Sequence, residues 1–245
     1  MRVYSNTDIG MIRDLNEDYY DNIIEENWAL LIVADGMGGH KAGEVASMMA
    51  VEGIKNFICE NTSRITNRLE LLEKAIEEGN KKIYGLATSS EDCSNMGTTV
   101  VLAFIEGDCL YAANVGDSRA YLMNEYGFKQ ISRDHSLVND LLHYGTITEE
   151  EAKTYNRKNV ITRSVGLEEA VEVDSIAMEF SKGDQLLLCT DGLNGQLEDS
   201  EIEAVLRDSA LALEDKVEKL IDMANEAGGT DNVTVTLFDN EEVAE

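Results

Sequence analysis

The chain has 245 residues, with 20 Lys and Arg against 48 Asp and Glu, and therefore a formal net charge of −28. Nucleic acids and anionic membrane surfaces need a basic face, so this charge argues against both as partners. A hydrophobic fraction of 43% and apolar runs along the whole sequence argue against disorder. The length fits one large domain with a substantial core.

Signals for export or membrane insertion are missing from the sequence. The N-terminal residues have no signal-peptide core, and no run approaches the roughly 18 apolar residues of a membrane span. Four cysteines show neither CxxC nor zinc-ligand spacing, which is typical of free thiols in a reducing compartment: Cys59, Cys93, Cys109 and Cys189. We therefore expect a cytoplasmic protein without membrane insertion.

Apolar patterns predict the elements. Short runs rich in branched and aromatic residues predict strands at 28–34, 97–105, 110–115, 119–123, 176–180, 185–189 and 233–238. Apolar residues at helical spacing predict helices at 46–57, 68–86 and 217–224, and polar segments predict short helices at 136–143 and 149–155. Two capping boxes are expected to begin helices: Thr148 with Glu151, and Ser200 with Glu203.

The order of these elements favours an α+β fold. Strands follow one another at hairpin distances, which indicates antiparallel sheets, and helices grouped in pairs would cover the outer faces of packed sheets. We expect one domain over residues 1–245, since no linker or repeat interrupts the sequence. The polar segment 134–163 is inserted between strands, either as a surface flap or as an ordinary helical connection.

Acidic residues stand at the ends of predicted core strands. The runs LLIVADG and QLLLCTDG each lead a buried strand directly into Asp-Gly, at Asp35 and Asp191. Glycine at that point lets the backbone turn tightly and bring a carbonyl towards an ion. Further acids lie beside other strands or near the N-terminus: Glu17, Asp18, Asp117 and Asp231.

Gathered together, these acids would repel one another unless cations neutralised them. All are hard oxygen donors, which favours Mg²⁺ or Mn²⁺ over zinc or copper. Paired divalent ions about 3.5–4 Å apart can activate a water for in-line phosphoryl displacement. The alternative remains that Asp-Gly forms ordinary hairpin turns and that Glu17 and Asp18 are solvated surface charges.

Arg13 adds a cation to this acidic set. Its guanidinium is suited to clamp a phosphate bidentately. The alternative is a surface salt bridge to Asp14 or Glu17, which are close to it in the sequence.

Several sequence blocks together carry a family resemblance. In chain order they are RDLNED (13–18), DGMGGHKAGEVAS (35–47), GTT (97–99), NVGDSR (114–119), DHS (134–136), NVITRSVG (159–166), DQLLLCTDGL (184–193) and GTDNVTV (229–235). The sequence closely resembles the PPM family, the metal-dependent serine/threonine protein phosphatases of the 2C type, in its bacterial single-domain branch. The resemblance implies an αββα sandwich, two antiparallel sheets flanked by helix pairs, with the flap near 134–163 bordering the cleft.

The resemblance also implies roles for the acids and for Arg13. Asp35 would bridge two Mn²⁺ or Mg²⁺ ions, and Asp18 would act through water on the metals. Arg13 would hold the substrate phosphate. The other implied metal ligands are the Gly36 carbonyl and Glu17 on one ion, Asp191 and Asp231 on the other, and Asp117 with Asp191 on a third, weaker ion.

The implied activity is hydrolysis of phosphoserine and phosphothreonine in proteins. A water bridging the two ions would attack phosphorus directly and in line, without a phosphoenzyme. The implied partners are phosphorylated proteins and, by analogy, a membrane-anchored Ser/Thr kinase, in a signal-transduction setting; we expect a monomer. Eukaryotic members have a histidine where this chain has Met37, so the general acid stays unassigned, with His40 or a metal-bound water as candidates.

Two other functions compete with this interpretation. One is a non-catalytic module that binds phosphoproteins or cations, although the presence of all the implied acids argues against it. The other is a phosphoesterase for small molecules.

Overall fold

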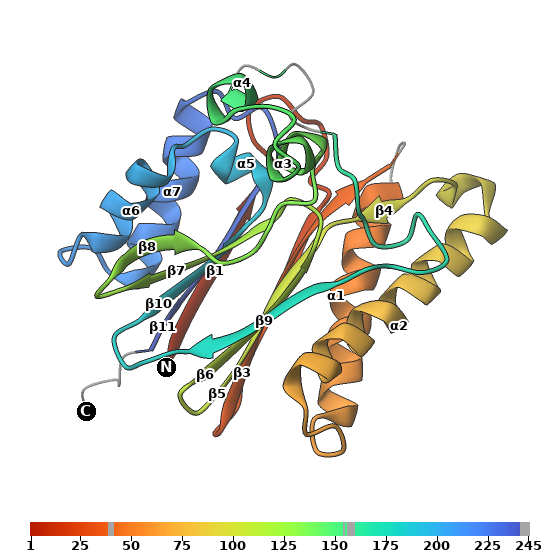
Figure 1. Ribbon diagram of the computed structural model, residues 1–245, viewed down its shortest axis with the longest axis horizontal. Coiled ribbons are helices and arrows are strands. Elements are labelled where there is room, and N and C mark those ends of the chain that lie inside the picture. Colours follow the sequence, from red (N-terminus) through yellow and green to blue (C-terminus); the bar gives the residue numbers. More distant parts are fainter. Residues whose placement is uncertain (39–41, 154, 156–159, 241–245) are drawn as a thin grey trace.

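Two antiparallel sheets lie face to face, and helices cover the outer face of each (Figure 1). The computed structural model describes residues 1–38, 42–153, 155 and 160–240. In spatial order the first sheet contains β1 (Arg2–Asp8), β11 (Val233–Asp239), β10 (Gln185–Cys189), β7 (Arg119–Asn124) and β8 (Gly127–Gln130). The second contains β2 (Asp18–Ile24), β3 (Trp28–Met37), β5 (Val100–Glu106), β6 (Cys109–Val115) and β9 (Asp174–Glu179), with β4 (Gly97–Thr98) paired to β3. The predicted pair of antiparallel sheets is confirmed.

Helices flank the sheets on both sides (Figure 1). The second sheet packs against α1 (Ala42–Asn61) and α2 (Arg68–Ser89), which a short 3₁₀ turn, η1 (Glu91–Cys93), follows. The first sheet packs against α7 (Leu213–Glu226), with α5 (Asp191–Asn194) and α6 (Asp199–Arg207) beside it. The insert at 134–163 carries α3 (Leu137–His143) and α4 (Glu149–Lys153). No helix within the described ranges combines the length and hydropathy that a bilayer crossing requires.

The central strand β3 explains the layering. Alternate residues of a strand point to opposite faces. Leu30 and Ile32 belong to the core beneath α1 and α2, whereas Leu31 and Val33 belong to the core between the two sheets. An apolar run without alternation is therefore what a strand buried on both faces requires.

The strand predictions are confirmed with small shifts, but three strands escaped the pattern. The predicted run 97–105 is split into β4 and β5 at Thr99, whose backbone N–H donates to the Asp35 carbonyl at 2.8 Å. β1, β2 and β8 were missed because each lies at the edge of its sheet and mixes polar with half-buried residues. Their pairing comes from neighbours that are distant in sequence.

One capping prediction is right and the other is wrong. Thr148 and Glu151 form the expected reciprocal bonds at the start of α4, at 2.8 Å and 3.2 Å. The box predicted at Ser200 and Glu203 lies two residues earlier, with Glu198 as the cap and Glu201 bonding back to its N–H at 2.9 Å. The prediction relied on the usual preference for Ser or Thr at a helix N-cap. Here Glu198 occupies the cap, so that preference placed the helix start at the wrong residue.

Candidate functional site

The strand ends bring the predicted acids to one end of the sandwich. Asp35, near the end of β3, is the direct register partner of Asp18 at the start of β2. In the other sheet, Asp191 follows β10 and Asp231 precedes its neighbour β11. Asp117 lies in the turn between β6 and β7. With Glu17, these residues are called the carboxylate cluster below.

Asp18 links the two sheets. One carboxylate oxygen, Oδ2, accepts bonds from the hydroxyls of Thr190 at 2.9 Å and Thr234 at 2.6 Å, both from the first sheet. The other oxygen, Oδ1, is buried and has no hydrogen-bond partner in the described part of the chain. Burial raises the pKa of Asp18 to about 7, and repulsion from Asp191 and Asp231 adds to the effect against the two threonine bonds.

Mutual repulsion also acts on Asp35, Asp117 and Asp191. Burial, and then the charges of Asp18 and Asp191, raise the pKa of Asp35 well above its usual range. Burial and the charge of Asp191 raise the pKa of Asp117 to about 7. Burial and the charge of Asp231 raise the pKa of Asp191 to about 6. The Asp191 carboxyl group lies within hydrogen-bonding reach of Asp35. The geometry therefore collects negative charge in a place where water is scarce.

Unpartnered oxygens show what the cluster lacks. Four buried carboxylate oxygens at this end of the molecule have no hydrogen-bond partner among the described residues: Glu17 Oε1, Asp18 Oδ1, Asp117 Oδ1 and Asp191 Oδ1. Such oxygens are expensive to bury unless a cation satisfies them. They fit Mg²⁺ or Mn²⁺, which prefer carboxylate oxygens. In the described part of the chain no three His, Cys, Asp or Glu side chains are spaced to hold an ion alone, so carbonyls and water would complete the coordination, as Mg²⁺ generally requires.

The backbone segments next to Glu17 leave no room for a Cβ at Gly36 or at Gly43. The Gly36 N–H donates to the Glu17 carbonyl at 3.0 Å, and Ser47 Oγ donates to the same oxygen at 2.6 Å. A Cβ on Gly36 would lie 2.6 Å from that carbonyl oxygen and would clash with the Gly43 carbonyl. A Cβ on Gly43 would clash with the Glu17 carboxylate. Both glycines therefore let the end of β3 and the start of α1 close on this acid.

Asn232 holds the loop that carries Glu17. Its Oδ1 accepts from the Glu17 N–H at 2.9 Å, while its Nδ2 donates to the carbonyls of Ile9 and Leu15, each at 2.9 Å. Sequence reasoning assigned no role to Asn232, Thr190 or Thr234. The available signal was their position beside Asp191 and Asp231, within the GTDNVTV and TDG blocks.

Arg13 lies at the rim of the cluster. Its side chain is 47% exposed, and its guanidinium donates to Asp231 Oδ2 at 2.7 Å. The sequence suggested a salt bridge from Arg13 to Asp14 or Glu17. The structure pairs Arg13 with Asp231 instead, which is distant in the sequence. An exposed guanidinium beside a candidate metal ligand is well placed to receive a phosphate.

His135 is a described histidine that does not belong to the carboxylate cluster. His40, a candidate general acid, lies outside the described residues, so its role stays a prediction. His135 is buried: its Nδ1 accepts from the Gly116 N–H at 3.1 Å, and its Nε2 lies 3.2 Å from Asp174. Burial lowers the pKa of His135. This side chain therefore fastens the insert to the turn that carries Asp117.

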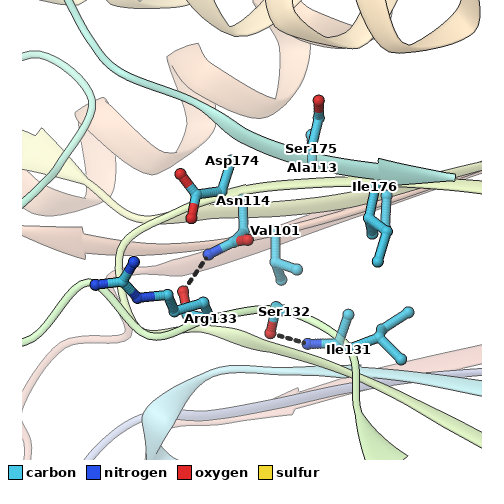
Figure 2. Close-up of a pocket in the computed structure, with 11 residues that line it drawn as sticks. Val101, Ala113, Asn114, Ile131, Ser132, Arg133, Asp174, Ser175 and Ile176 are labelled. Carbon is cyan, nitrogen blue, oxygen red and sulfur yellow. Dashed lines mark hydrogen bonds between the residues drawn. The ribbon is translucent and has the colours of Figure 1, made fainter. Parts of the chain in front are cut away.

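A separate cavity is visible in Figure 2 and has about 180 Å³ of space. It lies between β6, β9 and the segment after β8, with Ile176 on its wall. The amide of Asn114 donates to the Arg133 carbonyl at 2.8 Å, as drawn in Figure 2. Asp174 also lines the cavity, and its Oδ1 accepts a hydrogen bond from Arg163 Nη1 at 2.8 Å. No member of the carboxylate cluster lines this cavity, so it is distinct from the candidate metal centre.

The chain matches known proteins over almost its whole length. The profile of the family described as Protein phosphatase 2C matches residues 13–237. The serine/threonine phosphatase Stp of Listeria monocytogenes is 42% identical over 246 residues, covering 98% of this chain and 96% of that protein. The solved serine/threonine phosphatase of S. agalactiae has a TM-score of 0.91 at 38% identity, with 98% of this chain and 99% of that one covered. The catalytic domain of the phosphatase PstP, solved with 2 manganese ions, has a TM-score of 0.86 at 33% identity, with 98% of both chains covered.

Proposed function

The chain belongs to the protein phosphatase 2C family and is a serine/threonine phosphatase, and we propose that it hydrolyses phosphoserine and phosphothreonine in proteins by direct attack of water on phosphorus. The observation that carries this proposal is the carboxylate cluster with its four unpartnered buried oxygens, beside the exposed guanidinium of Arg13. The cluster supplies oxygen ligands for divalent cations, and the guanidinium supplies a phosphate contact. In-line displacement by water needs no phosphoenzyme.

The proposed cofactors are two Mn²⁺ or Mg²⁺ ions, with a third, weaker site. The relative PstP, solved with 2 manganese ions, supports this choice of cation. When bound, the ions would neutralise the cluster and lower the pKa of a water molecule enough for it to act as a nucleophile. The residues that would hold them are Asp35 for both main ions, Glu17 and the Gly36 carbonyl for one of the two, Asp191 and Asp231 for the other, and Asp117 with Asp191 for the third.

The chain's own groups have complementary tasks in the reaction. Arg13 would clamp two phosphate oxygens and keep the phosphoryl group in line. Asp18, oriented by Thr190 and Thr234, would accept a hydrogen bond from water through its free Oδ1. The group that protonates the leaving oxygen stays unassigned, because Met37 carries no acid.

We propose the remaining organisation by analogy with the family. Residues 1–245 would form one phosphatase domain, in which the insert at 134–163 acts as the flap. The partners would be phosphorylated proteins and a membrane-anchored kinase that phosphorylates them. The proposed setting is a monomer in the cytoplasm.

A metal-dependence assay tests the function. The chelator-stripped protein is expected to release phosphate from a phosphothreonine peptide only when Mn²⁺ is added, and Asp191→Asn is expected to remove that release. Asp222→Asn, the same change at an exposed position of α7, is the matched control. Peptide binding without phosphate release would instead identify a binding module. Turnover restricted to sugar or nucleotide phosphates would identify a small-molecule phosphoesterase.

A further inference from the structure

The loop between β1 and β2 exposes apolar side chains beside Arg13. Met11 and Ile12 are each 68% exposed, and Leu15 is 42% exposed. These three residues are called the apolar rim below. All three lie within five consecutive residues, whereas singly scattered exposed apolar residues are ordinary on protein surfaces.

The loop is held firmly, so the exposure does not result from a frayed segment. The Met11 N–H donates to the Gly229 carbonyl at 2.7 Å, and the Gly10 N–H donates to Asp8 Oδ1 at 2.8 Å. Gly10 has a φ of +80°, and a Cβ there would lie 2.9 Å from the Gly229 carbonyl oxygen. The Asn232 amide fixes both ends of the loop through two carbonyls, as described above. A loop so anchored presents its side chains with little ordering cost on binding.

The position of the rim restricts what can cover it. Arg13 lies between Ile12 and Leu15 in the sequence and pairs with Asp231 of the carboxylate cluster. The loop is at the same end of the molecule as α3, α4 and α5 (Figure 1). A phosphoresidue that reaches Arg13 therefore brings its flanking residues over the rim.

We propose that Met11, Ile12 and Leu15 dock apolar side chains that flank the phosphoresidue of a protein substrate. This inference rests on the proposed function, because the phosphoryl group must be bound at Arg13. Within residues 9–15 the charged side chains are Arg13 and Asp14, so the rim itself offers no surplus cation to an acidic flank. With a net charge of −28, the chain also repels acidic segments at long range. The rim thus selects apolar over acidic sequence around the phosphoresidue.

The expected size of the effect follows from the area that such a contact covers. Partial burial of one apolar side chain on each partner corresponds to about a fivefold to tenfold change in affinity. The rim touches residues that do not react, so it binds the ground state and the transition state equally. The effect should therefore fall on KM, with kcat little changed.

The test compares two phosphothreonine peptides, one with Leu and Ile flanks and one with Ser and Gln flanks, in the presence of Mn²⁺. The ratio of their kcat/KM values is expected to favour the apolar peptide in the wild type and to fall about fivefold to tenfold in Ile12→Ser. Ile12→Val is expected to keep most of the preference. Ile24→Ser is the matched control, since Ile24 is 42% exposed at the far end of the seven-residue strand β2, about 20 Å from Asp18.

The outcomes separate the two proposals. Turnover of both peptides with the same ratio in wild type and Ile12→Ser would overturn the apolar rim and leave the phosphatase function intact. A fall in the ratio that Ile24→Ser reproduces would also overturn the rim. Failure of the wild type to turn over either peptide or an aryl phosphate with Mn²⁺ would overturn the proposed function, and the rim with it.

Discussion

The buried acid Asp134 and the carboxylate cluster have opposite surroundings. Asp134, at the start of the insert, accepts three bonds from Arg119 at 2.7–3.0 Å and a fourth from Gln130 at 2.7 Å. In the carboxylate cluster, four buried oxygens have no hydrogen-bond partner within residues 1–38, 42–153, 155 and 160–240. Burial is common to both groups, so burial alone does not mark a functional site. The contrast lies in lone pairs that the protein leaves unsatisfied, which is what a cation site requires.

The largest expected effect comes from removing a central acid of the cluster. Asp35→Asn keeps the side-chain shape and removes the charge. Losing several kcal/mol of transition-state stabilisation by the metal corresponds to a fall in kcat/KM of at least about a thousandfold. Turnover of a phosphothreonine peptide with Mn²⁺ measures it. Since repulsion in the cluster is relieved, the metal-free variant should unfold at an equal or higher temperature than the wild type. A variant that is inactive because it is unfolded would contradict this account.

Removing the charge of Asp134, whose oxygens are hydrogen-bonded, should lower the stability of the fold. Asp134→Asn leaves the Arg119 charge without its partner, which is expected to lower the free energy of unfolding by about 3 kcal/mol. Urea titration measures the loss. Asp140→Asn is the matched control, because its pair with Arg133 is over 30% exposed on both sides and should contribute less than about 1 kcal/mol. Equal losses in the two variants would remove the contrast between a buried and an exposed pair.

Metal stabilisation should depend on pH in a defined direction. Burial and repulsion raise the pKa of Asp18 and Asp117 to about 7 and that of Asp191 to about 6. These groups ionise near about pH 4 in the unfolded chain, so the metal-free protein loses stability as the pH rises from about 4 to 7. Saturating Mn²⁺ offsets this loss and is expected to raise Tm by about 5–10 °C above pH ~7, and by less near pH ~5. Thermal melts with and without chelator measure the difference, and a larger gain at the lower pH would contradict the assignment.

The smallest expected effect concerns the orientation of Asp18. Thr234→Val removes one of its two hydroxyl donors, the one at 2.6 Å, while Thr190 remains. A loss of about 1 kcal/mol corresponds to about a fivefold fall in kcat/KM. Thr236→Val is the control on the same strand, because that buried hydroxyl bonds to Ser5 instead. Equal activity losses in the two variants would assign Thr234 to folding alone.

The sequence predicts the acids better than it predicts what surrounds them. Asp35 and Asp191 stand out because an apolar run leads directly into Asp-Gly, which is a local signal. The partners of Asp18 were not predictable in the same way, since Thr190 and Thr234 lie 172 and 216 residues away and meet it only through the fold. Arg119 and Asp134 likewise come together through the fold. Edge strands such as β2 were missed for the same reason, because their pairing is set by neighbours rather than by their own pattern.

The proposed function depends on divalent cations binding to the unpartnered oxygens of the carboxylate cluster. Calorimetric titration of the chelator-stripped protein with Mn²⁺ tests it most directly. We expect two ions bound per chain in the wild type, a weaker third step, and loss of the main binding in Asp35→Asn but not in Asp134→Asn. Absence of saturable Mn²⁺ binding, or binding that Asp35→Asn leaves unchanged, would contradict it.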